Sequence, residues 1–172
     1  MLRLQQIIEQ LGLEPLPVEG GLFKQTYCSP ETISREHLPD RYLVDKPMGT
    51  AIYYLLTADV DSYSALHKLP TVEIYHFYLG DPVELLQLHP DGSTEIITLG
   101  QDILAGQKVQ HLVPKGVWQG SHLASGGNFA LMGTTMAPGY TPEDYVGGTF
   151  SELAAHYPAQ TDLIRQLTRD AV

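Results

Sequence analysis

Residues 62–80 read SYSALHKLPTVEIYHFYLG, and this stretch carries the strongest structural signal in the chain. Two runs rich in Tyr, Phe, Ile and Leu flank the short segment KLPTV, a pattern that predicts two strands joined by a turn. His67, Glu73 and His76 lie within or beside these runs. A carboxylate on the buried face of a strand costs roughly several kcal/mol unless it is paired, hydrogen-bonded or bound to something. Glu73 is therefore expected to have a polar partner.

Strand parity indicates which side chains of this stretch share a surface, because successive residues of a strand point to opposite faces. Parity places His67 on one face with Tyr63 and Ala65, and Glu73 on one face with Tyr75. If the two runs form a hairpin, His67 and Glu73 meet beside its turn. Such a pair serves as half of a metal site, as an acid/base pair in which Glu73 orients the imidazole, or as a simple ion pair. The residues alone leave these three interpretations open.

Composition narrows the class of protein. The chain has 172 residues, which predicts a single domain (1–172) large enough to bury a core without disulfides or metal ions. Its one cysteine, Cys28, excludes a disulfide framework and a cluster of thiolate ligands. The formal net charge of -10 disfavours nucleic acid and anionic membranes as partners. No apolar run is long enough to span a membrane, and the first residues do not resemble a signal peptide, so a cytoplasmic location is expected.

The pattern along the chain predicts a short helix, a long β-rich middle and a helical tail. Leu4, Ile7, Ile8 and Leu11 follow helical spacing before Gly12, which predicts an amphipathic helix over residues 3–11. Between residues 21 and 145, nine strand-like runs separated by turn residues predict a sandwich or barrel. They read LFKQTY, TAIYYLLT, SYSALHK, VEIYHFYLG, VELLQLH, TEIITLG, QKVQHLVP, VWQGSHLA and NFALMGTTMA.

Two further segments flank or interrupt this rhythm. Thr149 and Glu152 form a capping-box pattern, and the apolar residues after them predict two short helices within residues 149–171. Residues 29–49 are long, charged and proline-containing. A loop of that length indicates a functional flap, an arm used in oligomerisation or a plain surface excursion.

The chain resembles the cupin superfamily through two motifs. Cupins carry a Gly, then His-x-His, a Glu and, after six more residues, a Gly; His67 and Glu73 through Gly80 are similar to the end of this motif. Their second motif has Pro-x-Gly and then a His, and residues 114–119, PKGVWQ, are similar to it with Gln119 at the histidine position. Ala65 stands where the first motif has its first His, so two of the four usual metal ligands are absent.

Longer strings point to one small single-domain cupin family whose function is uncharacterised. These strings are PVEGGLFKQTY, AIYYLL, SALHKL, EIYHFYLGDP, VPKGVWQ and MAPGYTPEDY, and they cover the chain from about Leu13 to Tyr145. The resemblance implies a mainly β fold, the cupin double-stranded β-helix or jelly-roll barrel, with short terminal helices. In the first string, Pro17, Val18 and Cys28 replace residues usual in that family.

The resemblance implies a small polar, sugar-like ligand in the barrel lumen. An isomerase or epimerase would use His67 as base and a tyrosine as acid, with Tyr75, Tyr27 and Tyr140 as candidates and Glu73 as a residue that tunes the imidazole. The expected catalytic residues are His67, Glu73 and Tyr75. The expected ligand contacts are Glu19, Phe23, Tyr27, Trp118, Gln119 and Tyr140.

Two alternatives to a metal-independent enzyme remain. The barrel could hold a ligand without catalysis, since fold alone does not separate binding from chemistry. It could also hold a divalent metal through His67, Glu73 and Gln119, although no cofactor is predicted because so few ligands are present. The expected partners are a small molecule and a second copy of the chain, because a β-rich chain with exposed edges favours a homodimer.

Overall fold

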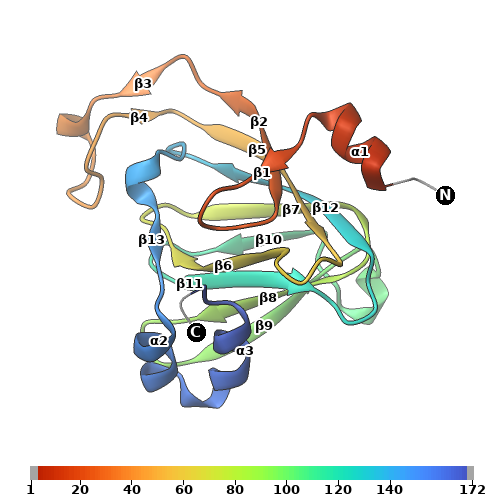
Figure 1. Cartoon of the computed structure of the whole chain (residues 1–172). Coiled ribbons are helices and arrows are strands. Elements are labelled where there is room, and N and C mark those ends of the chain that lie inside the picture. The colour runs from red at the N-terminus through yellow and green to blue at the C-terminus, as the bar shows by residue number, and fades with distance from the viewer. Residues whose placement is uncertain (1–3, 170–172) are drawn as a thin grey trace.

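The computed structural model describes residues 4–169, which fold into two antiparallel sheets that face each other and close into a barrel (Figure 1). In the larger sheet the strands run in the order β1 (Glu14–Pro15), β2 (Leu22–Cys28), β5 (Thr50–Thr57), β12 (Phe129–Met136), β7 (Glu73–Gly80) and β10 (Gln110–Val113). In the smaller sheet the order is β13 (Val146–Gly147), β6 (Tyr63–Lys68), β11 (Trp118–Leu123), β8 (Val83–Leu88) and β9 (Thr94–Leu99). The nine predicted strands and the predicted jelly-roll barrel are confirmed.

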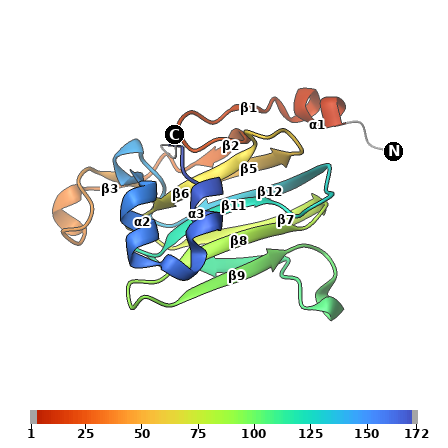
Figure 2. The same cartoon turned by 60° about the horizontal axis from the view of Figure 1, so that its bottom comes forward.

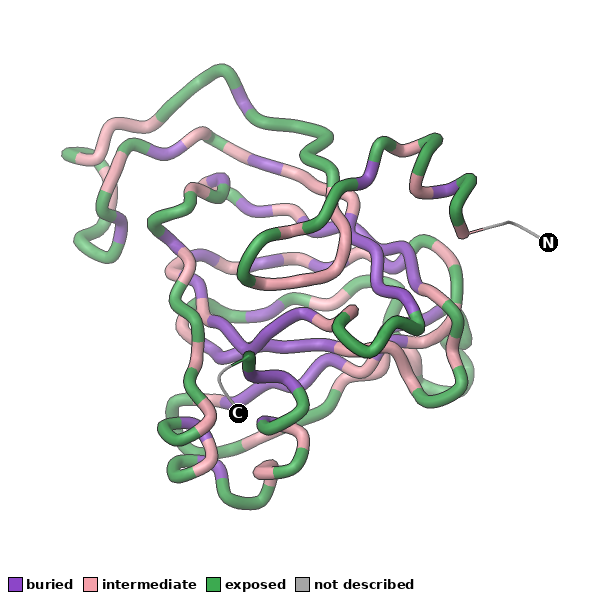
Figure 3. The backbone as a smooth tube through the Cα atoms, in the orientation of Figure 1, coloured by how far each residue is buried: buried purple, intermediate pink, exposed green. Residues whose placement is uncertain are grey.

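The core lies between the two sheets and is built by alternation along the strands. On β8, Val83 and Leu85 face the interior, whereas Leu86 and Leu88 point outward beneath the C-terminal helices. Because both faces of β8 are covered, its sequence is an apolar run and not an alternating one. Figure 3 shows that buried residues concentrate along the central strands of both sheets.

Helices cover the outer faces of the barrel. Helix α1 (Leu4–Leu11) packs Ile7 against Leu55 and Leu131 on the outside of the larger sheet. The structure confirms residues 4–11 of the helix predicted over 3–11, and residue 3 lies outside the described part of the chain. Within residues 4–169, no helix is both long enough and apolar enough to cross a membrane.

The C-terminal helices lie side by side against the outer face of the smaller sheet (Figure 2). Helix α2 (Phe150–His156) begins at Thr149, whose hydroxyl accepts a hydrogen bond from the Glu152 backbone N–H, as the capping pattern predicts. A 3-10 turn, η4 (Pro158–Gln160), leads into α3 (Thr161–Gln166). The end of the predicted tail, residues 170 and 171, lies outside the described residues.

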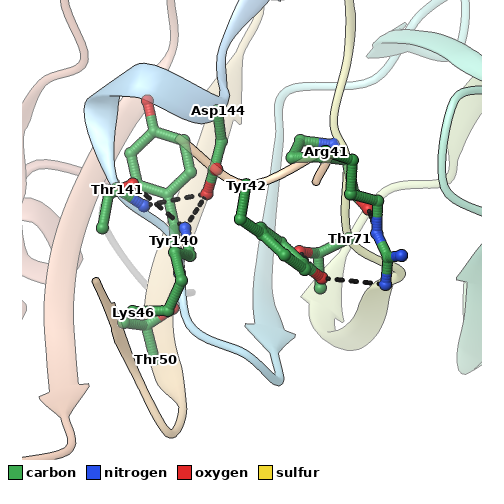
Figure 4. Close-up of polar contacts among 9 residues, drawn as sticks. Arg41, Tyr42, Lys46, Thr50, Thr71, Tyr140, Thr141 and Asp144 are labelled. Atoms are coloured by element: carbon green, nitrogen blue, oxygen red, sulfur yellow. Dashed lines mark hydrogen bonds and ion pairs between the residues drawn. The ribbon is translucent and has the colours of Figure 1, made fainter. Parts of the chain in front are cut away.

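Residues 29–49 form an arm that projects from the barrel (Figure 1). It contains two-residue strands β3 (Thr32–Ile33) and β4 (Lys46–Pro47), which pair with each other, and the 3-10 turn η1 (Arg35–His37). Figure 4 shows the polar contacts that Tyr42 and Lys46 of the arm make. Tyr42 accepts a hydrogen bond from the Thr71 hydroxyl at 2.9 Å, so the arm also contacts the connection between β6 and β7.

Lys46 of β4 is the arm's buried anchor, with 0% of its surface exposed. Its ammonium pairs with Asp144 at the end of the turn η3 (Pro142–Asp144) and donates to the Thr141 hydroxyl at 3.0 Å. The backbone N–H of Thr141 also donates to Asp144, at 3.0 Å. The arm is therefore tied to the segment that carries Tyr140.

Replacing Lys46 by Met is expected to destabilise the fold by about 3–5 kcal/mol, because it leaves the buried Asp144 carboxylate without its cation. Urea unfolding measures the loss. Lys115→Met, at an exposed lysine, is the matched control and is expected to change stability by less than about 0.5 kcal/mol. The double variant Lys46→Met/Asp144→Leu should recover much of the lost stability. Equal stability of Lys46→Met and Lys115→Met would contradict the anchoring role.

Candidate functional site

A cavity of about 490 Å³ opens between the two sheets at one end of the barrel. Most of its wall comes from the larger sheet, through β2, β5, β7 and β12. The smaller sheet contributes His67 from β6, and Leu69 and Tyr140 complete the wall from the connecting segments. Both apolar and titratable side chains line this space, which suits a small molecule with a polar part.

A β-bulge in β6 decides which of its residues face the cavity. The register pairs Gln119 with His67 and Ser121 with Ser64, so β6 has one residue more than β11 between these pairs. His67 and Ser64 therefore share the inner face, and Tyr63 packs outside with the C-terminal helices. The parity prediction that grouped His67 with Tyr63 is wrong, because the bulge breaks the period of two.

The backbone groups freed by this bulge bind to distant parts of the chain. The Ala65 N–H donates to the Glu19 carbonyl at 2.9 Å, and the Leu66 N–H donates to the Leu167 carbonyl at 2.8 Å. The bulge is thus stabilised from both ends of the sequence. Its hydrogen bonds explain why an extra residue costs little here.

The imidazole of His67 is held in one orientation. It is 2% exposed, its Nδ1 lies 2.8 Å from the Ala65 carbonyl oxygen, and its ring stacks on Tyr145 with 5.1 Å between centroids. A carbonyl only accepts hydrogen bonds, so Nδ1 carries the proton and the neutral ring keeps its lone pair on Nε2. The expectation that Glu73 orients this ring is wrong, because the Ala65 carbonyl does so.

Glu73 is the buried carboxylate of the site, with 8% of its surface exposed. The Gln119 amide Nε2 donates to its Oε2 at 2.7 Å, and the Thr134 hydroxyl also hydrogen-bonds to it. Burial raises the pKa of this carboxyl, while the nearby His67 and the two hydrogen bonds oppose the rise. The predicted polar partner of Glu73 is therefore Gln119 from the opposite sheet.

His67 and Glu73 do not flank a hairpin turn. Strand β6 belongs to the smaller sheet and β7 to the larger one, so residues 69–72 cross between the sheets. The two side chains approach each other across the interior and not along one surface. The hairpin prediction is wrong because the short segment 69–72 connects strands of two different sheets, and not two neighbouring strands of one sheet.

Three tyrosines of this region lie at different depths. Tyr140 lines the cavity, and burial together with Glu19 raises its pKa to about 12. Tyr75 and Tyr54 are 1% exposed and lie in the core below, where burial raises the pKa of each phenol well above its usual value. Among the predicted acids, Tyr140 is the one that lines the cavity; Tyr75 does not.

The segment 17–21 brings Glu19 into the cavity, as expected, and Phe23 follows from β2. The Glu19 carboxylate accepts a hydrogen bond from the Ser64 hydroxyl at 2.7 Å. Gly21 has a φ of 71°, and a Cβ there would lie 2.7 Å from the Tyr54 hydroxyl oxygen. Only glycine allows this close turn, which places Glu19 against β6.

Three predicted ligand contacts, Trp118, Gln119 and Tyr27, do not line the cavity. Trp118 points to the outer face of β11, where it packs with the C-terminal helices and Lys68 lies 4.4 Å from its ring centroid. Its neighbour Gln119 points inward, as the alternation of the strand requires, but it is 1% exposed and reaches the cavity only through its hydrogen bond to Glu73. Tyr27 is 53% exposed on β2 and does not line the cavity.

The sequence reasoning missed Tyr145, Thr134 and Ser64. Tyr145 lies in the string MAPGYTPEDY but outside any strand pattern, so no periodicity indicates that it covers His67. Thr134 points inward from β12, and alternation along that strand could have predicted this. Ser64 becomes an inner residue only through the bulge.

A metal site of the usual cupin kind does not fit these residues. Across residues 4–169, no three His, Cys, Asp or Glu side chains gather in a way that could hold an ion. Gln119 turns an amide N–H toward Glu73, and N–H groups do not coordinate cations. The remaining set, His67 and Glu73, is too small for the imidazole-rich sites that transition metals prefer.

The two facing sheets, the cavity between them and its inward histidine and glutamate define a cupin barrel. The family model described as Cupin superfamily (DUF985) matches residues 5–146. The chain belongs to this family.

Individual proteins of known structure or sequence are also similar to this chain. Protein SO0799 from Shewanella oneidensis superposes with a TM-score of 0.84 at 30% identity, covering 98% of this chain and 99% of that one. A hypothetical protein from Leishmania major has a TM-score of 0.84 at 25% identity, covering 97% and 99%. The uncharacterized protein YML079W from Saccharomyces cerevisiae is 31% identical over 135 residues, covering 74% of this chain and 66% of the yeast protein.

Replacing Glu73 by Gln is expected to stabilise the fold at neutral pH and to have little effect in acid. The folded pKa is raised from 4.5, so ionisation of Glu73 opposes folding once the pH exceeds that value. The gain should therefore appear above about pH 4.5 and grow until the carboxyl is fully ionised in the folded state. Melting temperatures at pH 4 and pH 8 check this, and a gain confined to pH 4 would contradict it.

Proposed function

We propose that the cavity binds a small polar, sugar-like molecule and that His67 acts on it as a general base in an isomerisation or epimerisation. One observation carries this proposal: the Ala65 carbonyl holds the Nδ1 proton of His67, which leaves the Nε2 lone pair as the basic atom of a buried, stacked ring. A histidine held in a single orientation with one free ring nitrogen is suited to act as a general base.

The chemistry would proceed through proton transfer beside a carbonyl group. Nε2 of His67 removes a proton from the carbon next to the carbonyl, and the electron pair moves onto the carbonyl oxygen. Return of a proton to the same carbon from the other face inverts its configuration and restores the carbonyl. Return to the former carbonyl carbon isomerises a 2-hydroxy carbonyl substrate, because the hydroxyl proton passes to the former carbonyl oxygen and a new carbonyl forms at the neighbouring carbon. After an inversion in which His67 takes one proton and Tyr140 gives another, proton exchange with solvent restores both groups.

Tyr140 is the best candidate for the proton donor. It lines the cavity, and a pKa of about 12 keeps its phenol protonated at neutral pH. The negative charge of Glu73 in its ionised form would stabilise the imidazolium formed on His67.

A non-catalytic binding function is the second candidate, and one observation favours it. In the described part of the chain, Glu73 hydrogen-bonds to Gln119 and Thr134, and no carboxylate bonds to His67. The imidazolium would thus lack the directly bonded counterion that many catalytic histidines have. The same residues would then simply hold the ligand.

Incorporation of deuterium from solvent into keto-sugars separates the two candidates. We expect His67→Ala to lower exchange by at least about 100-fold, because a positioned general base contributes about 10²–10⁴. Tyr140→Phe should slow exchange while leaving binding largely intact. Mass spectrometry of the recovered sugar measures both effects, and His37→Ala, an exposed histidine of the arm, is the matched control.

Tight sugar binding without exchange would favour the binding function. Exchange that survives in His67→Ala would remove His67 from the chemistry. Elemental analysis of the same preparations addresses metal: stoichiometric metal that is lost in His67→Ala would contradict a metal-free reaction.

A further inference from the structure

We infer that the cavity selects a small organic cation, such as a protonated amine on a hydroxylated body, over neutral and anionic molecules of the same shape. This inference rests on the proposal that the cavity binds a small molecule, and it adds the charge of that molecule. The evidence for it is the set of charged side chains that line the cavity and the hydrogen-bond partners of the carboxylates among them.

The wall is unequal in charge. Three carboxylates, those of Glu14, Glu19 and Glu73, line the cavity, against the single ammonium of Lys24. No arginine belongs to this lining. Arginine and lysine clusters are the usual means of binding phosphate and carboxylate groups, so the wall offers an anion little recognition.

The carboxylates of Glu19 and Glu73 are hydrogen-bonded to neutral groups. The nearby Arg169 guanidinium donates to the backbone carbonyl of Glu19, at 3.1 Å. Glu73 receives its hydrogen bonds from an amide and a hydroxyl, and Glu19 from the hydroxyl of Ser64. Neither takes part in the salt bridges found among residues 4–169. The buried ammonium of Lys46 is already engaged by Asp144. A buried carboxylate without a cation favours a ligand that supplies one.

The negative charge is felt across the mouth of the cavity. Burial raises the pKa of Tyr140, which lines the cavity, and of Tyr145, which stacks on His67, and the charge of Glu19 adds to both rises, while Arg169 opposes the rise at Tyr145. Glu73 and Glu143 add to it at Tyr140. The ring of Phe23 and the phenol of Tyr140 also line this space, and aromatic faces attract organic cations.

Apolar residues determine the rest of the ligand. Leu16, Ile52, Leu69 and Met136 form part of the wall. A bare inorganic cation would leave this surface without contact, whereas an amine carried on a ring or chain would cover it. The combination of carboxylates, aromatic rings and an apolar wall is what an organic amine requires.

Glucosamine, glucose and glucose 6-phosphate are matched probes that carry a positive, zero and negative charge. Titration calorimetry of the intact protein should rank their affinities in that order, with at least about a tenfold difference between the first and the last. Glu19→Gln and Glu73→Gln should each reduce the preference, whereas Glu31→Gln, at an exposed glutamate of the arm, should leave it unchanged. Tighter binding of the phosphate, or equal binding of glucose and glucosamine, would overturn the inference.

A second measurement tests the charge preference without requiring that a sugar binds. In a Cys28→Ser background, Ile52→Cys places a thiol on the cavity wall, and trimethylammonium-ethyl and sulfonato-ethyl methanethiosulfonates compete for it. We expect the ratio of cation to anion rates to exceed that at the exposed native Cys28 by at least about tenfold, and Glu19→Gln to lower it. A ratio equal to or below that of Cys28 would overturn the inference.

The two measurements separate this inference from the proposed function. If no sugar binds but the reagent ratio is high, the sugar-like ligand is wrong and the charge preference stands. If glucose 6-phosphate binds best, a small-molecule function stands and the charge preference is wrong.

Discussion

The hydrogen bond from the Gln119 amide to the Glu73 carboxylate joins the two sheets at the floor of the cavity. A carboxylate at an inward position of a central strand is costly, and its cost is offset only if the facing sheet supplies donors. Gln119 on β11 does this, and Thr134 on β12 adds a second donor. Burial raises the pKa of Glu73, and the hydrogen bond from Gln119 opposes that rise. At the position where a cupin usually has a metal-ligating histidine, the chain has a residue that donates to a carboxylate, which changes the chemistry that the barrel can perform.

The arm extends this design to the mouth of the cavity. Lys46 binds Asp144 and Thr141, and Tyr42 contacts Thr71. These contacts attach the arm to the two segments that carry Tyr140 and Leu69 into the cavity wall. The arm, residues 29–49, therefore helps to position residues of the cavity wall. The Lys46 ammonium pairs with Asp144 and does not line the cavity. The negative charge of Glu19 and Glu73 is therefore available to a ligand.

Much of the fold could be predicted from local patterns. The nine main strands, the helix before Gly12 and the cap at Thr149 each depend on neighbouring residues, so their signals are contained in short windows. The four two-residue strands β1, β3, β4 and β13 were not predicted, since two residues carry no periodicity. In the site, parity correctly placed Glu73 on one face with Tyr75, and both side chains are buried. It failed at β6, because the bulge there is stabilised by the carbonyls of Glu19 and Leu167, far away in sequence.

The sequence by itself determined the class of fold and the residue types available to the site: one buried histidine, one buried glutamate, and a glutamine and an alanine at positions where metal ligands are usual. These follow from side-chain chemistry and from alternation along each strand. Only the tertiary structure decided that His67 and Glu73 meet across two sheets, that Trp118 faces outward, and that Tyr140 and Tyr145 cover the site. The physical reason is that each of these facts depends on contacts between segments distant in sequence, whose hydrogen bonds and packing have no counterpart in the local pattern.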